Sequence, residues 1–254
     1  MEQEQISEIV RELERCKSVL FVTGAGISAE SGLPTYRGIG GLYEQDETAE
    51  GIPIEAALSG AMFRRDPRIT WKYIHQIERS CRAAGPNRAH EAIAEIEGRF
   101  DRVWTLTQNV DGLHHAAGSK QVIDIHGDVH RLVCTRCGHR WRVKDYAGLS
   151  IPPSCPECDS LVRPEVVLFG EMLPMDRVRV LQEQLARGFD AVFSIGTTSV
   201  FPYIAEPVID ARRRGGLTVE INPGASEVSH VVKHRLRAGA AAVLDALVRA
   251  LDRL

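Results

Sequence analysis

The sequence has no long apolar run and no excess of positive charge. No stretch approaches the roughly eighteen consecutive apolar residues of a membrane-spanning helix, so we expect no membrane segment. The 31 Lys and Arg residues are outnumbered by 34 Asp and Glu residues, and the formal net charge is −3. Because binding to nucleic-acid phosphates needs a clustered basic surface, this balance argues against a nucleic-acid-binding protein.

The start of the chain, MEQEQISEIVRELERC, lacks the apolar core of a secretion signal. Six cysteines in such a chain predict a reducing, cytoplasmic compartment, where paired cysteines bind metal more often than they form disulfides. Hydrophobic residues make up 44% of the chain and charged residues 26%, as in ordinary globular proteins. The length of 254 residues allows one large domain, alone or with a smaller one.

Short apolar runs alternate with stretches of helical periodicity. The alternation predicts an α/β fold in which a Rossmann-like parallel sheet carries helices on both faces. We expect strands at 19–22, 103–107, 122–125, 191–196 and 217–221, and helices at 88–97, 204–214 and 240–254. Two interruptions are interpreted as insertions that form a smaller lobe. The predicted parts are therefore a large domain of 1–37, 86–126 and 166–254, a loop and helical module of 38–85, and a module of 127–165.

A glycine turn follows the first expected strand, and we expect a helix after this turn. Gly24-Ala25-Gly26-Ile27-Ser28-Ala29 fits the G-x-G-x-x-G/A pattern, in which the glycines and the start of a following helix bind a pyrophosphate. A turn of this kind can also simply join a strand to a helix. The acidic strand end that dehydrogenases place about 20 residues later is missing, and the loop GIGGLYEQDE stands there instead.

Two cysteine pairs, CTRC at 134–137 and CPEC at 155–158, have the spacing of a zinc ribbon. Four thiolates complete a tetrahedron around zinc and leave no position for water or substrate, so we predict a structural rather than a catalytic ion. The same module could contact nucleic acid through the basic stretch 136–144. Its six Lys and Arg residues against five Asp and Glu residues favour a solvated surface instead. The predicted zinc ligands are Cys134, Cys137, Cys155 and Cys158.

Polar residues follow two of the expected strands. Gln108, Asn109 and Asp111 come after 103–107, and His126 comes after 122–125. Ligands of parallel α/β sheets bind beyond the carboxyl ends of the strands. A lone histidine at a strand end is more often a hydrogen-bonded structural residue. Together with the Gln108–Asp111 segment, His126 becomes a candidate general base, because the ordinary pKa of histidine lies near neutrality.

These residues together resemble the sirtuin family of NAD-dependent protein deacylases. The matching segments occur in family order over nearly the whole chain: GAGISAESGLPTYRG (24–38), PNRAH (86–90), TQNVDGLHHAAG (107–118), IHG (125–127), both cysteine pairs, RPEVVLFGE (163–171), GTTS (196–199) and EINPG (220–224).

The resemblance implies a Rossmann-like large domain and a small lobe made of a zinc ribbon and a helical module. NAD, a consumed co-substrate, and an acyl-lysine protein or peptide would meet in the cleft between them. The implied catalytic residues are His126, Asn109 and Asp111. The implied NAD-binding residues are Gly24, Ala25, Gly26, Tyr36, Arg37, Gln108, Asn109, Asp111, Gly196, Thr197, Asn222 and Ala240. The implied substrate-binding residues are Ile74, Ile77, Val167, Phe169, Gly170 and Glu171.

In the mechanism that the resemblance implies, the acyl oxygen displaces nicotinamide from C1′ of the ribose. His126 then helps to deprotonate a ribose hydroxyl, and the products are free lysine and O-acyl-ADP-ribose. Residues 166–171 would pair with the substrate as a β-strand, and the loop 37–53 would act as a lid that keeps water out.

The chain departs from the family pattern at Tyr36, where Phe is common, and in GTTSVFPY, where Pro202 comes one residue early. The second departure puts the contacts beyond Thr198 in doubt. Desuccinylating members carry a Tyr and an Arg, three residues apart, on the helix before PNxxH. Ile74 and Ile77 occupy those positions here.

A gap shifted by two would instead give Lys72 and His75. Neither alignment supplies the Tyr and Arg pair, so we predict a pocket for acetyl or another neutral acyl group. Alternatively, the two isoleucines simply belong to the core. Two other functions stay open at this point: transfer of ADP-ribose from NAD to protein, and a non-catalytic zinc module that binds nucleic acid.

Overall fold

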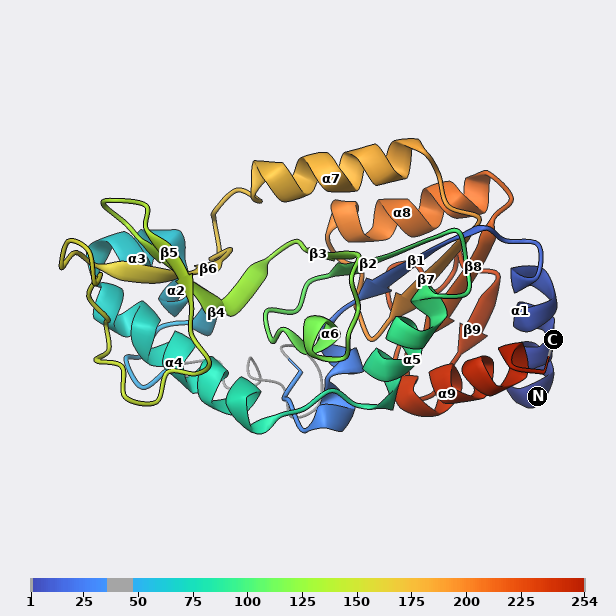
Figure 1. The fold of residues 1–254 in the computed structure, drawn as a ribbon, viewed down its shortest axis with the longest axis horizontal. Helices are drawn as coiled ribbons and strands as arrows, with labels where there is room; N and C mark the ends of the chain where they lie inside the picture. The colour runs from blue at the N-terminus through green and yellow to red at the C-terminus, as the bar shows by residue number, and fades with distance from the viewer. Residues whose placement is uncertain (1, 36–47, 254) are drawn as a thin grey trace.

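The computed structural model describes residues 2–35 and 48–253. Its larger part is a sheet of six parallel strands in the order β3-β2-β1-β7-β8-β9 (Figure 1). The strands are β1 (Ser18–Thr23), β2 (Arg102–Thr107), β3 (Val122–Asp124), β7 (Ala191–Ile195), β8 (Leu217–Ile221) and β9 (His234–Leu236). The short 3-10 turns Ala25–Ile27 and Ala29–Ser31 follow β1.

Helices cover both faces of this sheet (Figure 1). One face carries α1 (Glu2–Leu13), α5 (Arg88–Glu97) and α9 (Ala240–Leu251), and the other carries α7 (Met175–Ala186) and α8 (Pro202–Arg213). The short α6 (Leu113–Ala116) follows β2. Strand β1 is buried at all six residues, as expected for the centre of a sheet with two covered faces.

A smaller lobe contains a second, three-stranded antiparallel sheet with the order β5-β4-β6. Its strands are β4 (Gly127–Cys134), β5 (Arg140–Arg142) and β6 (Val162–Val166), and its helices are α2 (Ile54–Ala57), α3 (Gly60–Arg65) and α4 (Pro67–Ala83). Trp71, Tyr146 and Leu132 lie at the centre of its separate apolar core. The predicted fold is confirmed, whereas the domain boundaries stay a prediction.

One predicted element is wrong. We expected a helix after the glycine turn, and the chain forms two 3-10 turns instead. The amide of Gly26 donates to the carbonyl oxygen of Gly196 at 2.8 Å, which ties this segment to the loop after β7. A left-handed residue, Gly32, then ends the second turn. The amides at this site therefore belong to a turn and not to the start of a long helix.

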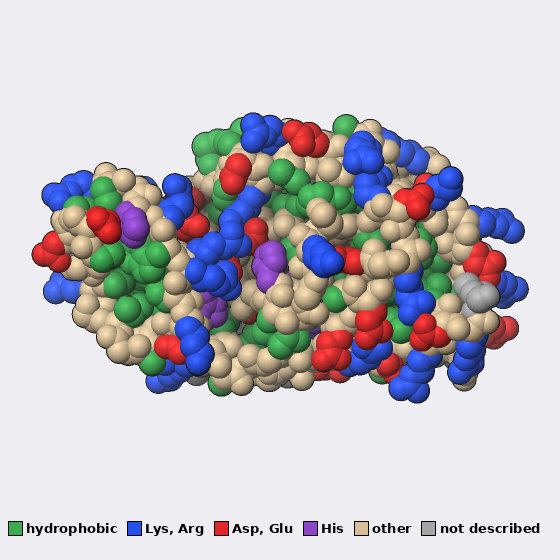
Figure 2. All heavy atoms as spheres, viewed as in Figure 1, with side chains coloured by type: hydrophobic (Ala, Val, Ile, Leu, Met, Phe, Trp, Pro, Cys, Tyr) green, Lys and Arg blue, Asp and Glu red, His purple; other side chains and the backbone are tan. Residues whose placement is uncertain are grey.

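Both chain ends lie beside α1 and α9, at the end of the molecule opposite the small lobe (Figure 1). Lys, Arg, Asp and Glu side chains all occur on the face drawn in Figure 2, and a group of apolar side chains lies on the small lobe. Among the helices of the described ranges, none has the length and apolar character needed to cross a membrane. The cytoplasmic location stays a prediction.

Candidate active site

A cavity of about 480 Å³ lies at the carboxyl ends of the central strands. Parallel pairing of β1 with both β2 and β7 brings the three loops that follow these strands to one edge of the sheet. The predicted site residues that line the cavity are Gly24, Ala25, Gly26, Ile74, Ile77, Gln108, Asn109, His126, Val167, Phe169, Gly170, Glu171, Gly196, Thr197 and Asn222. Segments that are far apart in the sequence therefore meet at one place.

The glycines of this edge let two loops touch. A Cβ atom on Gly24 would lie 2.8 Å from the carbonyl oxygen of Gly196, and one on Gly26 would lie 2.6 Å from the Cα atom of Gly196. Gly196 itself has a positive φ of 57°. The glycine pattern is therefore required by backbone packing between the loops after β1 and β7, and this packing shapes the floor of the cavity.

The amide side chain of Asn109 is held firmly and keeps one free acceptor. Its Nδ2 atom donates to the carbonyl oxygen of Gly24 and to Oγ of Ser28, each at 3.1 Å. Within residues 2–35 and 48–253, the buried Oδ1 atom has no hydrogen-bond partner. A buried acceptor without a partner is costly, and it suits a ligand that brings a donor, such as a carboxamide, a hydroxyl or a water molecule.

Gln108, Thr197 and Asn222 form a chain of hydrogen bonds along another side of the cavity. Nε2 of Gln108 donates to Oγ1 of Thr197 at 2.8 Å, and Nδ2 of Asn222 donates to the carbonyl oxygen of Thr197 at 3.0 Å. These bonds connect the loops after β2, β7 and β8, so polar groups that could bind a ribose are fixed before a ligand arrives.

His126 is held in one tautomer. Its Nδ1 atom lies 3.0 Å from the carbonyl oxygen of Gln108, which can only accept, so Nδ1 carries the proton. Nε2 is then the acceptor, and the Tyr203 hydroxyl donates to it at 2.7 Å. Burial lowers the pKa of His126 below its usual value, so the ring is neutral at pH 7 and can accept a proton.

Asp111 and Ala240 do not line the cavity. Asp111 instead lines a smaller cavity that shares Ala25 and Asn109 with the main one, and its carboxylate accepts from the Ser28 hydroxyl at 2.8 Å and from the Leu113 amide at 2.9 Å. Burial raises the pKa of Asp111. Ala240 begins α9 and is buried in the core of the large sheet. In this structure Asp111 therefore supports the residues that face a ligand, through Ser28.

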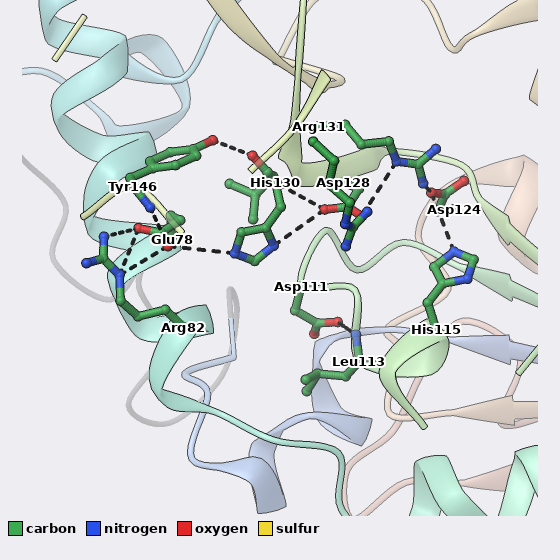
Figure 3. Close-up of polar contacts among 12 residues, drawn as sticks. Glu78, Arg82, Asp111, Leu113, His115, Asp124, Asp128, His130, Arg131 and Tyr146 are labelled. Carbon is green, nitrogen blue, oxygen red and sulfur yellow. Dashed lines mark hydrogen bonds and ion pairs between the residues drawn. The ribbon is translucent and has the colours of Figure 1, made fainter. Parts of the chain in front are cut away.

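An ionic network whose carboxylates are largely buried joins the two lobes close to Asp111 and Leu113 (Figure 3). In the small lobe, the fully buried Glu78 pairs with Arg82 of the next turn of α4. At the junction, Arg131 of β4 pairs with Asp124 at the end of β3. Asp128 lies between them and accepts from Arg142 at 2.6 Å. These pairs fix the start of β4, which immediately follows His126.

The four cysteines have the arrangement that zinc requires. Their Sγ atoms all lie within 4.8 Å of one another, with 3.5 Å between Cys134 and Cys158 and 3.7 Å between Cys137 and Cys155. A zinc–sulfur distance of about 2.3 Å places tetrahedral sulfurs about 3.8 Å apart. Backbone amides of 136 and 157 lie 3.4 Å from Sγ atoms and would support thiolates. The cluster is thus positioned to bind one structural zinc.

The Sir2 family model matches residues 24–202. A protein named NAD-dependent protein deacylase 2 from Pseudomonas aeruginosa is 46% identical over 246 residues, which cover 96% of each chain. This chain belongs to the Sir2 family. A solved Sir2 homologue in complex with ADP-ribose is 35% identical with a TM-score of 0.88, covering 97% of this chain and 96% of that one. A Sir2 structure with a deacetylated peptide and 3′-O-acetyl ADP-ribose is 28% identical with a TM-score of 0.83, covering 96% and 97%.

The prediction of family and fold is thereby confirmed, and the roles of single Sir2 residues stay predictions. Tyr36, Arg37 and most of the expected lid, up to residue 47, lie outside the described residues. The sequence did not reveal that Ser28 bridges Asn109 and Asp111, or that Tyr203 contacts His126. The unusual GTTSVFPY segment was the available signal for the second contact.

Proposed function

We propose that this chain removes acetyl or other neutral acyl groups from protein lysine. It would consume NAD and release nicotinamide, O-acyl-ADP-ribose and free lysine. Family membership and the deacylase name of the 46% identical relative support NAD-dependent deacylation. The observation that carries the proposal is the cavity that both a neutral His126 and Asn109, with its unpaired acceptor among the described residues, line.

The described residues fit NAD at several points. The packed loops after β1 and β7 would lie against the pyrophosphate, and the hydrogen-bonded chain of Gln108, Thr197 and Asn222 would hold ribose hydroxyls. The buried Oδ1 atom of Asn109 would accept from the nicotinamide carboxamide or from an ordered water molecule. When bound, NAD supplies the electrophilic ribose carbon.

His126 would act as the base. The bond from Nδ1 to Gln108 orients the ring and keeps the lone pair on Nε2, which is the atom that receives the proton. Because burial lowers the pKa of the ring, the imidazole is already neutral at pH 7 and is ready to accept a proton. Zinc would have no part in this step, since four thiolates leave it no open position.

The acyl group would lie against apolar side chains. The apolar residues that line the cavity include Leu58, Ile74, Ile77, Val110 and Val129. Of the described lining residues, Glu171 is the charged one, and its carboxylate is already paired with Arg163 at 2.8 Å. A succinyl carboxylate would have no positively charged partner among these residues to compensate for its lost hydration. A neutral acyl chain carries no charge that has to be desolvated. Ile74 also belongs to the core of the small lobe, so contact with the acyl group would be an additional role for this residue.

The substrate backbone would run along 166–171. The amide of Val167 already donates to the carbonyl oxygen of His126 at 2.8 Å, and Phe169 pairs with the Leu58–Gly60 segment on one side. These bonds hold Val167 and Phe169 along the cavity wall, where an added strand could pair with them. Residues 168–171 then form a turn, in which the Glu171 amide donates to the carbonyl oxygen of Leu168 at 3.0 Å.

A panel of one peptide with different lysine modifications tests the proposal. We expect acetyl and longer apolar acyl groups to be removed faster than succinyl, with O-acyl-ADP-ribose detected by mass spectrometry. His126→Ala is the matched control, and its turnover should fall at least about a hundredfold because the base is lost. Faster removal of succinyl would contradict the neutral pocket. Label from NAD that stays on protein would indicate ADP-ribosyl transfer instead.

A further inference from the structure

The lone pair of His126 is not free in this structure. Nδ1 donates to Gln108, so the imidazole has one acceptor, Nε2, and the Tyr203 hydroxyl occupies it at 2.7 Å. A substrate hydroxyl that must lose its proton to His126 therefore has two routes. Either Tyr203 moves away, or the proton passes through the Tyr203 hydroxyl.

The Tyr203 ring is held in place from two sides. Pro202 begins α8, and Tyr203 follows in its first turn. The ring stacks on Phe201 with centroids 5.5 Å apart and planes 13° apart. Both rings meet the edge or face of His126 at 6.1 Å with interplanar angles of 88° and 81°. Movement of Tyr203 away from His126 would disrupt this three-ring packing.

The Tyr203 hydroxyl can also receive a proton from the cavity. Tyr203 is one of the lining residues, and its hydroxyl has no second hydrogen-bond partner among residues 2–35 and 48–253. A phenol oxygen accepts as well as donates. Burial raises the pKa of Tyr203 to about 12, so the hydroxyl keeps its proton at neutral pH and is available as a donor to Nε2.

We propose that Tyr203 is a further catalytic residue, which relays a proton from a ribose hydroxyl of the substrate to Nε2 of His126. The inference rests on the deacylase function proposed above. The O–H bond of the substrate breaks, and its proton moves to Oη of Tyr203 while the phenolic proton moves to Nε2. The electron pair stays on the substrate oxygen, which becomes the nucleophile. Tyrosine ends neutral, and His126 ends as the imidazolium.

Kinetics of Tyr203→Phe test the relay. This variant keeps the ring stack and removes only the hydroxyl. We expect kcat for deacylation to fall at least about tenfold, while exchange of labelled nicotinamide into NAD, which precedes the step assigned to His126, stays within about twofold. Tyr73→Phe is the matched control, because its hydroxyl bonds Glu50 in the small lobe and does not line the cavity. Unchanged or faster deacylation by Tyr203→Phe would overturn the relay and indicate that Tyr203 merely blocks His126.

Solvent isotope effects give a second readout. In mixtures of H₂O and D₂O, a two-proton relay predicts a curved dependence of the wild-type single-turnover rate on deuterium content, and Tyr203→Phe should make it linear. A linear dependence in the wild-type protein would overturn the relay.

Nitrogen NMR of histidine-labelled protein without NAD tests the hydrogen bond independently of any activity. The His126 signals, identified by their loss in His126→Ala, should show a protonated Nδ1 and an Nε2 that shifts in Tyr203→Phe. An Nε2 signal that does not shift would overturn the contact. If the wild-type protein shows no turnover of acetyl-lysine peptide, the proposed function fails, whereas this NMR result still decides the contact.

Discussion

Acidification should destabilise this protein through a histidine that the reaction does not use. His90 lies in the first turn of α5, with no exposed surface. Its ring lies 3.1 Å from the Asn87 side chain and 5.0 Å, edge to face, from the ring of His114. Burial lowers the pKa of His90 to about 4, against 6.5 for an exposed histidine. At a pH between these two values, His90 therefore binds a proton in the unfolded chain but not in the folded chain.

The difference between the pKa of His90 in the folded chain and in the unfolded chain determines the sign and the size of the change in stability. Above pH 6.5 His90 is neutral in both states, so it has no effect on the pH dependence. As the pH falls through 6.5, the unfolded chain binds the proton first, and the free energy of unfolding decreases by up to about 1.4 kcal/mol per pH unit. Between pH 6.5 and about 4 the total loss is about 3 kcal/mol, and between pH 7 and 5 it is about 2 kcal/mol.

Urea unfolding at several pH values measures this effect in the wild-type protein and in His90→Gln. The variant should be less stable at pH 7, because a well-packed capping side chain is replaced. The difference in free energy of unfolding between the wild-type protein and the variant should shrink by about 2 kcal/mol at pH 5, since the variant has no proton to bind at this position. Titratable groups that do not contact His90 are present in both proteins and cancel in the difference. Parallel curves for the two proteins from pH 7 to 5 would refute the reasoning.

Two further predictions concern the metal and the glycine turn. Cys134→Ala should release zinc and unfold the small lobe, because binding of a structural zinc is part of the folding energy of this lobe. Metal analysis would detect the loss of zinc, and near-ultraviolet circular dichroism would detect the unfolding. A folded variant with normal zinc content would contradict the assignment. Gly26→Ala should cost about 1–3 kcal/mol of stability and weaken NAD binding measured by calorimetry, since the added Cβ would lie 2.6 Å from Gly196. Gly85→Ala is its control, because a Cβ there meets nothing within 4 Å, and equal effects of the two substitutions would refute the packing argument.

Local pattern was sufficient for much of the fold. The predicted strand 217–221 and the predicted helix 88–97 have the observed bounds. Both have strong local signals: an unbroken β-prone apolar run in the first, and an Asn87 cap followed by helical periodicity in the second. The segment after Gly26 was mispredicted because its conformation depends on a bond to Gly196, far away in the sequence. Boundaries that depend on such contacts are not visible in a local pattern.

The sequence by itself determined the cysteine cluster, the strand-end position of His126 and the family. Each depends on residue types at short, fixed spacings, and the zinc geometry follows from thiolate chemistry. Only the tertiary structure decided what surrounds His126. Tyr203 lies 77 positions further along the chain, and it reaches Nε2 because the parallel sheet brings the loops after β3 and β7 to one edge and because α8 begins at Pro202. A contact between distant loops carries no local periodicity, so it has to be observed in the folded chain.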